Sequence, residues 1–251
     1  MVLHGLYNNI RLTDSHIHLA DLEKWEPINN SPVCSCAASL SEMKKLVLLK
    51  NQYPNLVYSA FGIHPQNIDL NNVLILDELL ASNSINAIGE IGFDFFTKEL
   101  ASTFDIQQEA FNIQIELAIK FSKPVIIHCR KGMDKIFIYS KQLSKLPAVI
   151  FHSFSGSSVE GNSLLKKGIN CFFSFGKSLL KEKNRCIQCA KELPLERILA
   201  ETDAPFHKLP LEKTTLPSDI ILVYKEISKI KEIFLEEISL EVEKNFYNAF
   251  G

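Results

Sequence analysis

Short, continuously apolar segments recur along this chain and alternate with longer segments that place apolar residues at helical spacing. Eight such short segments lie between residues 12 and 201. An uninterrupted apolar run is typical of a strand that is covered on both faces of a parallel sheet. Strand–helix alternation through eight units predicts a (β/α)₈ TIM barrel, and 251 residues is close to the usual length of that fold.

The bounds of these elements can be read from the chain. The predicted strands are Leu12–His16, Val33–Ala38, Val57–Gly62, Ala87–Ile91, Val125–His128, Val149–Phe151, Cys171–Phe175 and Ile198–Glu201. Capping boxes predict where some of the helices begin, because a Ser and a Glu three residues later satisfy free backbone N–H groups there. The predicted helical features are capping boxes at Ser39–Glu42 and Ser157–Glu160, Asn72 as a cap of Val73–Leu80, and helices at Gln107–Phe121, Asp134–Leu143, Glu182–Leu193, Ile220–Lys231 and Leu240–Phe250.

The connection between the first two strands is unusually short. Only residues 20–32 separate them, and Pro27 restricts helix formation there. We expect a single short turn or none, which would leave that side of the barrel thinly covered. No repeat, low-complexity segment or linker interrupts the rest of the pattern, so residues 1–251 are expected to form one domain.

Composition narrows the class of protein. Hydrophobic residues make up 46% of the chain and the formal net charge is -2. This charge argues against coating nucleic acid by bulk electrostatics, but it is compatible with an enzyme that binds phosphates at one local site. No apolar run reaches the roughly 18 residues of a membrane span, and no signal peptide is evident. We therefore expect a cytoplasmic protein with no membrane partner, and a monomer is the favoured oligomeric state.

Six cysteines are present, and in a cytosolic chain they are expected to be reduced and buried. Cys186 and Cys189 have zinc-like spacing, and Cys34 and Cys36 form a closer pair. A zinc site would require the two pairs to meet, and one CxxC motif without a matched partner is weak evidence for that.

Histidines and carboxylates are concentrated at the predicted carboxyl ends of the strands. Asp14, His16 and His18 alternate along the first strand, so they share one face of it. Active groups of a TIM barrel lie at this end, and five of the seven histidines fall there. Four histidines and two carboxylates are enough for two metal ions with one bridging carboxylate. Such ion pairs clamp the attacking and leaving oxygens at phosphorus, which favours phosphoester hydrolysis.

The strand-end motifs resemble those of the TatD family of metal-dependent hydrolases. The resemblance runs from about Leu12 to the end and implies an amidohydrolase-like barrel with divalent-metal deoxyribonuclease activity, usually as a 3′→5′ exonuclease. DNA, as a single strand or a 3′ end, is then the expected substrate. The motifs in family order are Asp14-Ser15-His16-Ile17-His18, Gly62-Ile63-His64-Pro65, Gly89-Glu90-Ile91-Gly92-Phe93-Asp94, Pro124-Val125-Ile126-Ile127-His128, Phe151-His152-Ser153-Phe154-Ser155-Gly156, Glu201-Thr202-Asp203-Ala204-Pro205 and Asn245-Phe246-Tyr247-Asn248-Ala249-Phe250-Gly251.

The resemblance also implies roles for individual residues. It assigns Glu90 as the bridging ligand and places His64 against substrate phosphate, although a histidine packed in a loop before Pro65 is the alternative. Ligands of this kind favour two ions of Mg, Mn or Zn. The implied metal ligands are His16, His18, Glu90, His128, His152 and Asp203.

Three neighbouring residues are candidates for supporting roles. Arg130 could bind phosphate through both of its terminal nitrogens, or it could simply be solvated or salt-bridged. Glu201 and Asp94 share strand faces with ligands and could orient them, with plain structural hydrogen bonding as the alternative. Cys129 alternates with its neighbouring histidine and is expected to point away from the metals.

Asp203 is the expected general base. It ends the eighth strand, which lies beside the first in a closed barrel, so one oxygen could ligate metal while the other takes a proton from water. The alternative is an aspartate that caps a helix.

The loop over residues 206–217 departs from the family pattern, which is usually rich in Arg, Gly and Asn there. Lys177, Lys208 and Lys213, with Arg130, are candidate phosphate contacts. The ligand set alone does not separate a nuclease from a same-fold hydrolase of another ester or amide, such as an aminoacyl-tRNA deacylase. A metal-binding scaffold without turnover is a further alternative.

Overall fold

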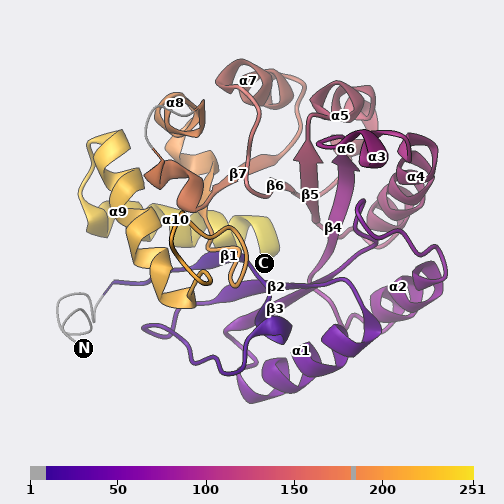
Figure 1. The fold of residues 1–251 in the computed structure, drawn as a ribbon, viewed down its shortest axis with the longest axis horizontal. Coiled ribbons are helices and arrows are strands. Elements are labelled where there is room, and N and C mark those ends of the chain that lie inside the picture. Colours follow the sequence, from indigo (N-terminus) through magenta and orange to yellow (C-terminus); the bar gives the residue numbers. More distant parts are fainter. Residues whose placement is uncertain (1–9, 182–184) are drawn as a thin grey trace.

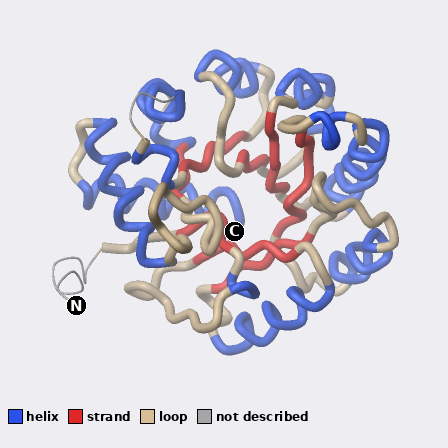
Figure 2. Tube along the Cα trace, in the orientation of Figure 1, coloured by secondary structure: helices blue, strands red, loops and turns tan. Residues whose placement is uncertain are grey.

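Parallel strands paired in chain order, from β1 to β8, surround the centre of the molecule, and helices surround the strands (Figures 1 and 2). The computed structural model describes residues 10–181 and 185–251. The predicted TIM barrel is therefore confirmed. Its strands are β1 (Asp14–Ile17), β2 (Val33–Ala37), β3 (Val57–Phe61), β4 (Ala87–Asp94), β5 (Val125–Arg130), β6 (Val149–Phe151), β7 (Cys171–Phe175) and β8 (Ile198–Ala200).

Strands β4 and β5 are longer than predicted. They remain paired as far as Asp94 and Arg130, which are register partners. Gly92 makes this possible, because a Cβ at that position would lie 2.0 Å from the His128 carbonyl oxygen. Register also shifts between Ile88 and Ile91 on β4 and within β1. Such irregularities re-aim side chains near active sites, and here they lie in the strands that carry Glu90 and His16.

The barrel closes between β8 and β1 through a mixture of backbone and side-chain bonds. Asp203 N donates to the His16 carbonyl (2.9 Å), and the hydroxyl of Thr202 donates to Asp14 Oδ2 (2.6 Å). Burial raises the pKa of Asp14 to about 7, against the opposing hydrogen bonds from Thr202. The side chain of Asp14 thus supplies part of the connection between β8 and β1 that backbone hydrogen bonds would supply in a regular sheet. This connection lies next to His16.

Helices α1 to α10 cover the barrel (Figure 1). Ser39 accepts a hydrogen bond from Glu42 N before α1, and both bonds of the predicted capping box at Ser157 are present before α7. The helices are α1 (Leu40–Gln52), α2 (Asn72–Ala81), α3 (Lys98–Ala101), α4 (Phe104–Lys120), α5 (Met133–Ile138), α6 (Ser140–Leu143), α7 (Ser158–Lys166), α8 (Arg185–Glu192), α9 (Ile220–Lys231) and α10 (Leu235–Phe250).

Some predicted helix bounds are wrong. Asn72 is the first residue of α2 and not its cap. The helix predicted over 134–143 is broken into α5 and α6 at Tyr139, whose buried hydroxyl donates to Asn112 on α4. Helices α4 and α10 begin earlier than predicted, at Phe104 and Leu235. Residues 182–184 of another predicted helix lie outside the described residues. Tertiary contacts, which local pattern does not contain, set these ends.

The short first crossover contains one 3₁₀ turn, Leu19–Asp21, as predicted. Inside the barrel, Ile126, Ile150 and Leu199 form an apolar cluster with Phe246 and Phe250 of α10, which packs against it. A larger apolar layer lies between the strands and the surrounding helices. Within the described ranges, no helix is long and apolar enough to cross a membrane.

Candidate metal centre

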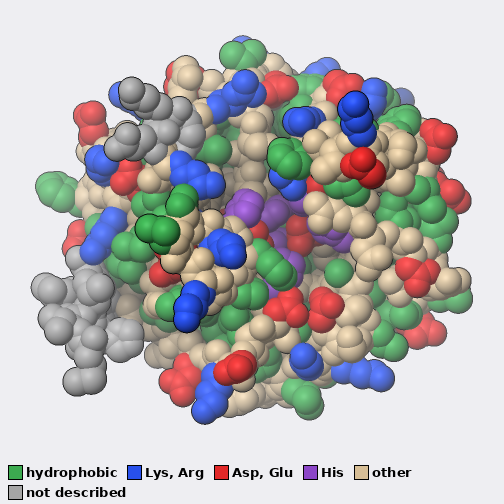
Figure 3. All heavy atoms as spheres, viewed as in Figure 1, with side chains coloured by type: hydrophobic (Ala, Val, Ile, Leu, Met, Phe, Trp, Pro, Cys, Tyr) green, Lys and Arg blue, Asp and Glu red, His purple; other side chains and the backbone are tan. Residues whose placement is uncertain are grey.

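Histidine side chains gather at the bottom of a hollow in the face of the barrel that carries the carboxyl ends of the strands (Figure 3). The hollow has a volume of about 1050 Å³. Its lining includes His18, His64, His128, His152 and His207. The strand-end histidines of the sequence are therefore brought to one place.

Four donor atoms form what we call the first donor cluster, and they come from β1, from β4 and from the segments that directly follow β1 and β8: His16 Nε2, His18 Nε2, Glu90 Oε1 and Asp203 Oδ1. The two histidine nitrogens lie 3.2 Å apart. Glu90 Oε1 lies 3.3 Å from His16 Nε2 and 3.4 Å from His18 Nε2. Asp203 Oδ1 lies 3.5 Å and 3.3 Å from the same two nitrogens. Both carboxylate oxygens thus lie within 3.5 Å of the same two histidine nitrogens.

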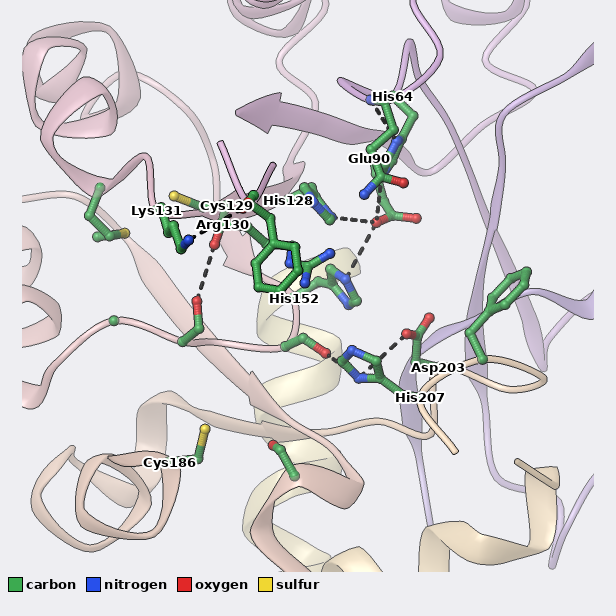
Figure 4. A pocket seen from close by; sticks show the side chains of 18 of the residues that line it. His64, Glu90, His128, Cys129, Arg130, Lys131, His152, Cys186, Asp203 and His207 are labelled. Atoms are coloured by element: carbon green, nitrogen blue, oxygen red, sulfur yellow. Dashed lines mark hydrogen bonds and ion pairs between the residues drawn. The ribbon is translucent and has the colours of Figure 1, made fainter. Parts of the chain in front are cut away.

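The other oxygen of Glu90 belongs to a second donor cluster, with His64, His128 and His152 (Figure 4). Glu90 Oε2 lies 3.4 Å from His152 Nε2, 3.5 Å from His128 Nδ1 and 3.6 Å from His64 Nε2. The carboxylate of Glu90 therefore faces one cluster with each oxygen. This is the arrangement expected of a bridging ligand.

The donor spacing fits a bound cation. Four ligands at about 2.1 Å from a tetrahedral ion lie roughly 3.4 Å from one another. The five distances given above for the first cluster are 3.2–3.5 Å. In the second cluster, His128 Nδ1 is buried without a hydrogen-bond partner, although it faces the Glu90 carboxylate. A buried, unpaired nitrogen of this kind is costly unless a ligand meets it. Across the two clusters, ligand atoms also lie within 4.8 Å of one another in three overlapping groups: His16 with His152 and Asp203, His16 with Cys36 and Glu90, and His64 with Glu90 and His128.

Each of three histidines is held from behind by a buried side chain. Asp94 Oδ2 lies 2.9 Å from His128 Nε2, and Glu201 Oε1 lies 3.2 Å from His152 Nδ1. Both carboxylates therefore lie next to the ring nitrogens that face away from Glu90. Such partners orient metal-binding imidazoles.

The third such contact was missed by sequence reasoning, which treated all cysteines as packing residues. Cys36 Sγ lies 3.4 Å from His16 Nδ1 and is completely enclosed. The available signal was its position at the end of the second predicted strand, where an inward side chain meets its neighbours on β1.

The charges of the centre are mutually supporting. Burial would raise the pKa of Glu90, but the nearby imidazoles of His16 and His152 hold it well below its usual range. Asp203 behaves in the same way: hydrogen bonds from His16 and His18 outweigh burial and lower its pKa. Burial alone would lower the pKa of His128, but the contact with Asp94 outweighs burial and raises this pKa to about 9. The cluster concentrates carboxylate charge that a divalent cation would neutralise.

Arg130 lines the hollow together with Lys131, Lys181 and Arg185. Its guanidinium stacks 3.9 Å above the ring of Phe96, and Nη1 lies 3.7 Å from Asp94 Oδ2. Its side chain remains 42% exposed, so the terminal nitrogens are still accessible.

One proposed phosphate contact is wrong. Lys177 is fully buried, and its Nζ donates to Glu212 (2.5 Å) and Asp219 (2.7 Å), so it ties down the loop over residues 206–217. Lys208 and Lys213 do not line the hollow. The sequence shows that this loop differs from the family pattern. It does not show the conformation of the loop, which depends on the buried pairing of Lys177 with Glu212 and Asp219.

The cysteines behave as single thiols. All six are free, and Cys186 and Cys189 donate to carbonyls beyond β6, far in the fold from the pair on β2. Cys129 lines the hollow but belongs to neither donor cluster.

A TIM barrel that brings imidazoles and carboxylates together at the carboxyl ends of its strands defines the class of metal-dependent hydrolases. The comparison with protein families specifies the member of that class. Residues 13–251 match the model of the TatD related DNase family, and the chain belongs to that family. It is a metal-dependent hydrolase.

Known relatives agree with this membership. The chain is 33% identical over 201 residues to the uncharacterized metal-dependent hydrolase YabD of Bacillus subtilis, covering 77% of each protein. It is 32% identical to the 3′-5′ ssDNA/RNA exonuclease TatD of Edwardsiella piscicida, over 67% of this chain and 65% of that protein. The crystal structure of the TatD homologue YjjV from Escherichia coli has the same fold, with a TM-score of 0.83 at 23% identity over 96% of this chain and 98% of that one.

Proposed function

We propose that this protein is a two-ion nuclease that hydrolyses DNA phosphodiester bonds and shortens strands from the 3′ end. The observation that carries the proposal is the division of the Glu90 carboxylate between two donor clusters. One ion would be held by His16, His18, Glu90 and Asp203. The other would be held by Glu90, His128 and His152, with Mg, Mn or Zn as the candidates. When bound, such ions acidify a coordinated water and offset charge that develops on the phosphate.

Asp203 is the proposed general base. Its Oδ1 faces His16 and His18, whereas its Oδ2 points to the other side, 3.6 Å from His207 Nδ1. One oxygen can therefore stay with the first donor cluster while the second accepts the proton of the attacking water. Asp203 does not act as a helix cap here, since it lies in a loop with a φ of 57°.

The remaining roles follow from position. Asp94 and Glu201 hold the rings of His128 and His152, so that the opposite nitrogens face Glu90. His64 lies within 3.6 Å of Glu90 Oε2, at the edge of the second donor cluster. In the proposed complex it contacts the scissile phosphate, and Arg130 binds a phosphate oxygen from the rim.

Two phenylalanines at the hollow favour an unpaired strand as substrate. Phe96 is 53% exposed beneath Arg130, and Phe206 is 50% exposed and meets His18 edge-on at 5.0 Å between ring centres. Exposed rings beside a phosphate-binding site are platforms on which single-stranded bases stack. The 3′→5′ direction rests on the relative from Edwardsiella piscicida, which bears that activity in its name.

The proposal is tested with single-stranded DNA labelled at the 5′ end, incubated with purified protein and Mg²⁺ or Mn²⁺. A ladder of progressively shorter 5′-labelled products is expected, together with immediate release of a single nucleotide when the label is at the 3′ end. RNA and an aminoacyl-tRNA are assayed in parallel. Turnover of the aminoacyl ester alone would reject the nuclease in favour of the deacylase alternative.

A further inference from the structure

His207 occupies a place in the centre that neither the metal clusters nor the proposed mechanism uses. It lines the hollow (Figure 4), and 48% of its side chain is exposed. Its Nδ1 lies 3.1 Å from Ser153 Oγ and 3.6 Å from Asp203 Oδ2. The histidine therefore sits beside the oxygen that we assign as the base, with part of its ring open to the hollow.

The hydrogen bonds around Ser153 decide which ring nitrogen of His207 carries the proton. Glu201 Oε1 accepts the backbone N–H of Ser153 at 2.9 Å, and it also accepts the Ser153 hydroxyl proton at 2.6 Å. The hydroxyl has only one proton, so towards His207 its oxygen can act only as an acceptor. Nδ1 of His207 is then the donor. In the neutral ring this leaves Nε2 with a free lone pair.

The backbone is arranged to keep this contact. Ser153, Asp203 and His207 have φ values of 43°, 57° and 51°, the left-handed region that non-glycine residues seldom occupy. Three neighbouring residues in that region are held there only where the surrounding fold requires it. Lys177 helps to hold His207 in this conformation, because its buried bond to Glu212 fixes the loop that follows His207.

A free lone pair selects its ligand by chemistry. Phosphate oxygens are acceptors only and would be repelled by it, whereas a hydroxyl donates a hydrogen bond to it. In an exonuclease substrate, the terminal sugar is attached to the scissile phosphate and carries such a hydroxyl.

We propose that His207, fixed by Ser153, is a specificity-determining residue whose Nε2 accepts a hydrogen bond from a hydroxyl of the substrate's terminal sugar. This inference rests on the proposed nuclease function. It makes His207 a sensor of a free strand end, which is what separates an exonuclease from an enzyme that cuts within a strand.

The test uses metal-loaded protein at pH 8 and three oligonucleotides that differ only in the terminal sugar: 3′-hydroxyl alone, 2′-hydroxyl alone, or neither. His207→Asn is the main variant, because asparagine tolerates the left-handed backbone and can still reach Ser153 but has no atom at the Nε2 position. Lys208→Asn is the matched control, since the neighbouring lysine does not line the hollow.

The wild-type protein and Lys208→Asn should favour one hydroxyl-bearing end over the hydroxyl-free end by about 2- to 10-fold in kcat/KM, the range of one hydrogen bond. The preferred hydroxyl, 3′ or 2′, identifies the source of the donor. His207→Asn should turn over all three oligonucleotides at similar rates. Equal rates for the wild-type protein, or a uniform loss in His207→Asn that keeps the preference, would overturn the inference.

Binding separates this inference from the proposed function. The affinities of the same proteins are measured for the three termini on oligonucleotides with a non-hydrolysable terminal linkage. Hydroxyl-dependent affinity that disappears in His207→Asn supports the inference even if no DNA is cleaved. Cleavage with no hydroxyl dependence in either measurement overturns the inference and leaves the nuclease proposal standing.

Discussion

Replacing Asp203 with asparagine removes the proposed base while preserving the shape of the side chain. Asp203 is 6% exposed, and its two oxygens face different partners. Oδ1 lies 3.5 Å and 3.3 Å from the Nε2 atoms of His16 and His18, and Oδ2 lies 3.6 Å from His207 Nδ1. In Asp203→Asn, the amide oxygen can remain at the first donor cluster, so the principal loss is the basic oxygen on the other side.

The size of the effect follows from this division. General-base catalysis contributes about 10²–10⁴-fold in rate, or roughly 3–5 kcal/mol of barrier, and we expect kcat to fall by at least that factor. The substitution leaves the side-chain volume unchanged but removes a negative charge that His16 and His18 stabilise. Tm in chelator should therefore fall by several degrees, about 3 °C for each kcal/mol lost at this size.

The assay compares kcat on labelled single-stranded DNA, metal content after loading, and Tm. Asp134→Asn is the control, because this carboxylate also lines the hollow but is paired with its neighbour Lys135 at the surface. The control should keep its activity within about twofold. Near-normal turnover in Asp203→Asn, combined with a lowered Tm, would show that Asp203 is structural and that the base lies elsewhere.

Other expectations concern metal, fold, ion pairing and salt. Metal titration followed by elemental analysis should reach two equivalents per chain, and saturation at one would refute the two-ion proposal. His16→Ala combined with His18→Ala should weaken one metal site but keep the circular dichroism of the chelated protein, because layered apolar side chains hold a barrel together; unfolding of the double mutant in chelator would contradict this. Lys177→Met should lower Tm by about 3–8 °C, since it leaves Glu212 and Asp219 without their buried partner. Burial alone would lower the pKa of Lys177, but the two carboxylates outweigh burial and raise this pKa above its ordinary 10.5. The Tm difference between the variant and the wild type should therefore persist below that pH and shrink as the pH rises beyond it. A Tm difference that does not change with pH would exclude the ion pairs as its cause. DNA affinity should fall with a shallow salt slope, about 0.7 per phosphate neutralised, and a steep slope would reveal a basic groove.

The sequence determined the architecture and the main donors of the metal centre. Continuous apolar runs could be recognised as parallel strands because both faces of such strands are buried. The carboxyl ends of those strands meet at one end of a barrel whatever the loops do. His16, Glu90, His128, His152 and Asp203 therefore had to approach one another once the strands were assigned, and the structure brings them together.

Other features were decided only by contacts between distant segments. Strand position could not show that each oxygen of Glu90 faces a different cluster, since this depends on irregular register in β4. Nor could it show that Cys36 on β2 stands behind His16 on β1, because the pairing of the two strands creates that contact.

The loop after β8 is the clearest case. In the sequence, residues 206–217 show no periodic pattern, and Lys177 is a candidate phosphate contact. In the fold, its burial against Glu212 and Asp219 fixes the loop and helps to bring His207 to Ser153. A loop has no periodic pattern of its own, so its conformation is set by the partners that the barrel happens to place beside it.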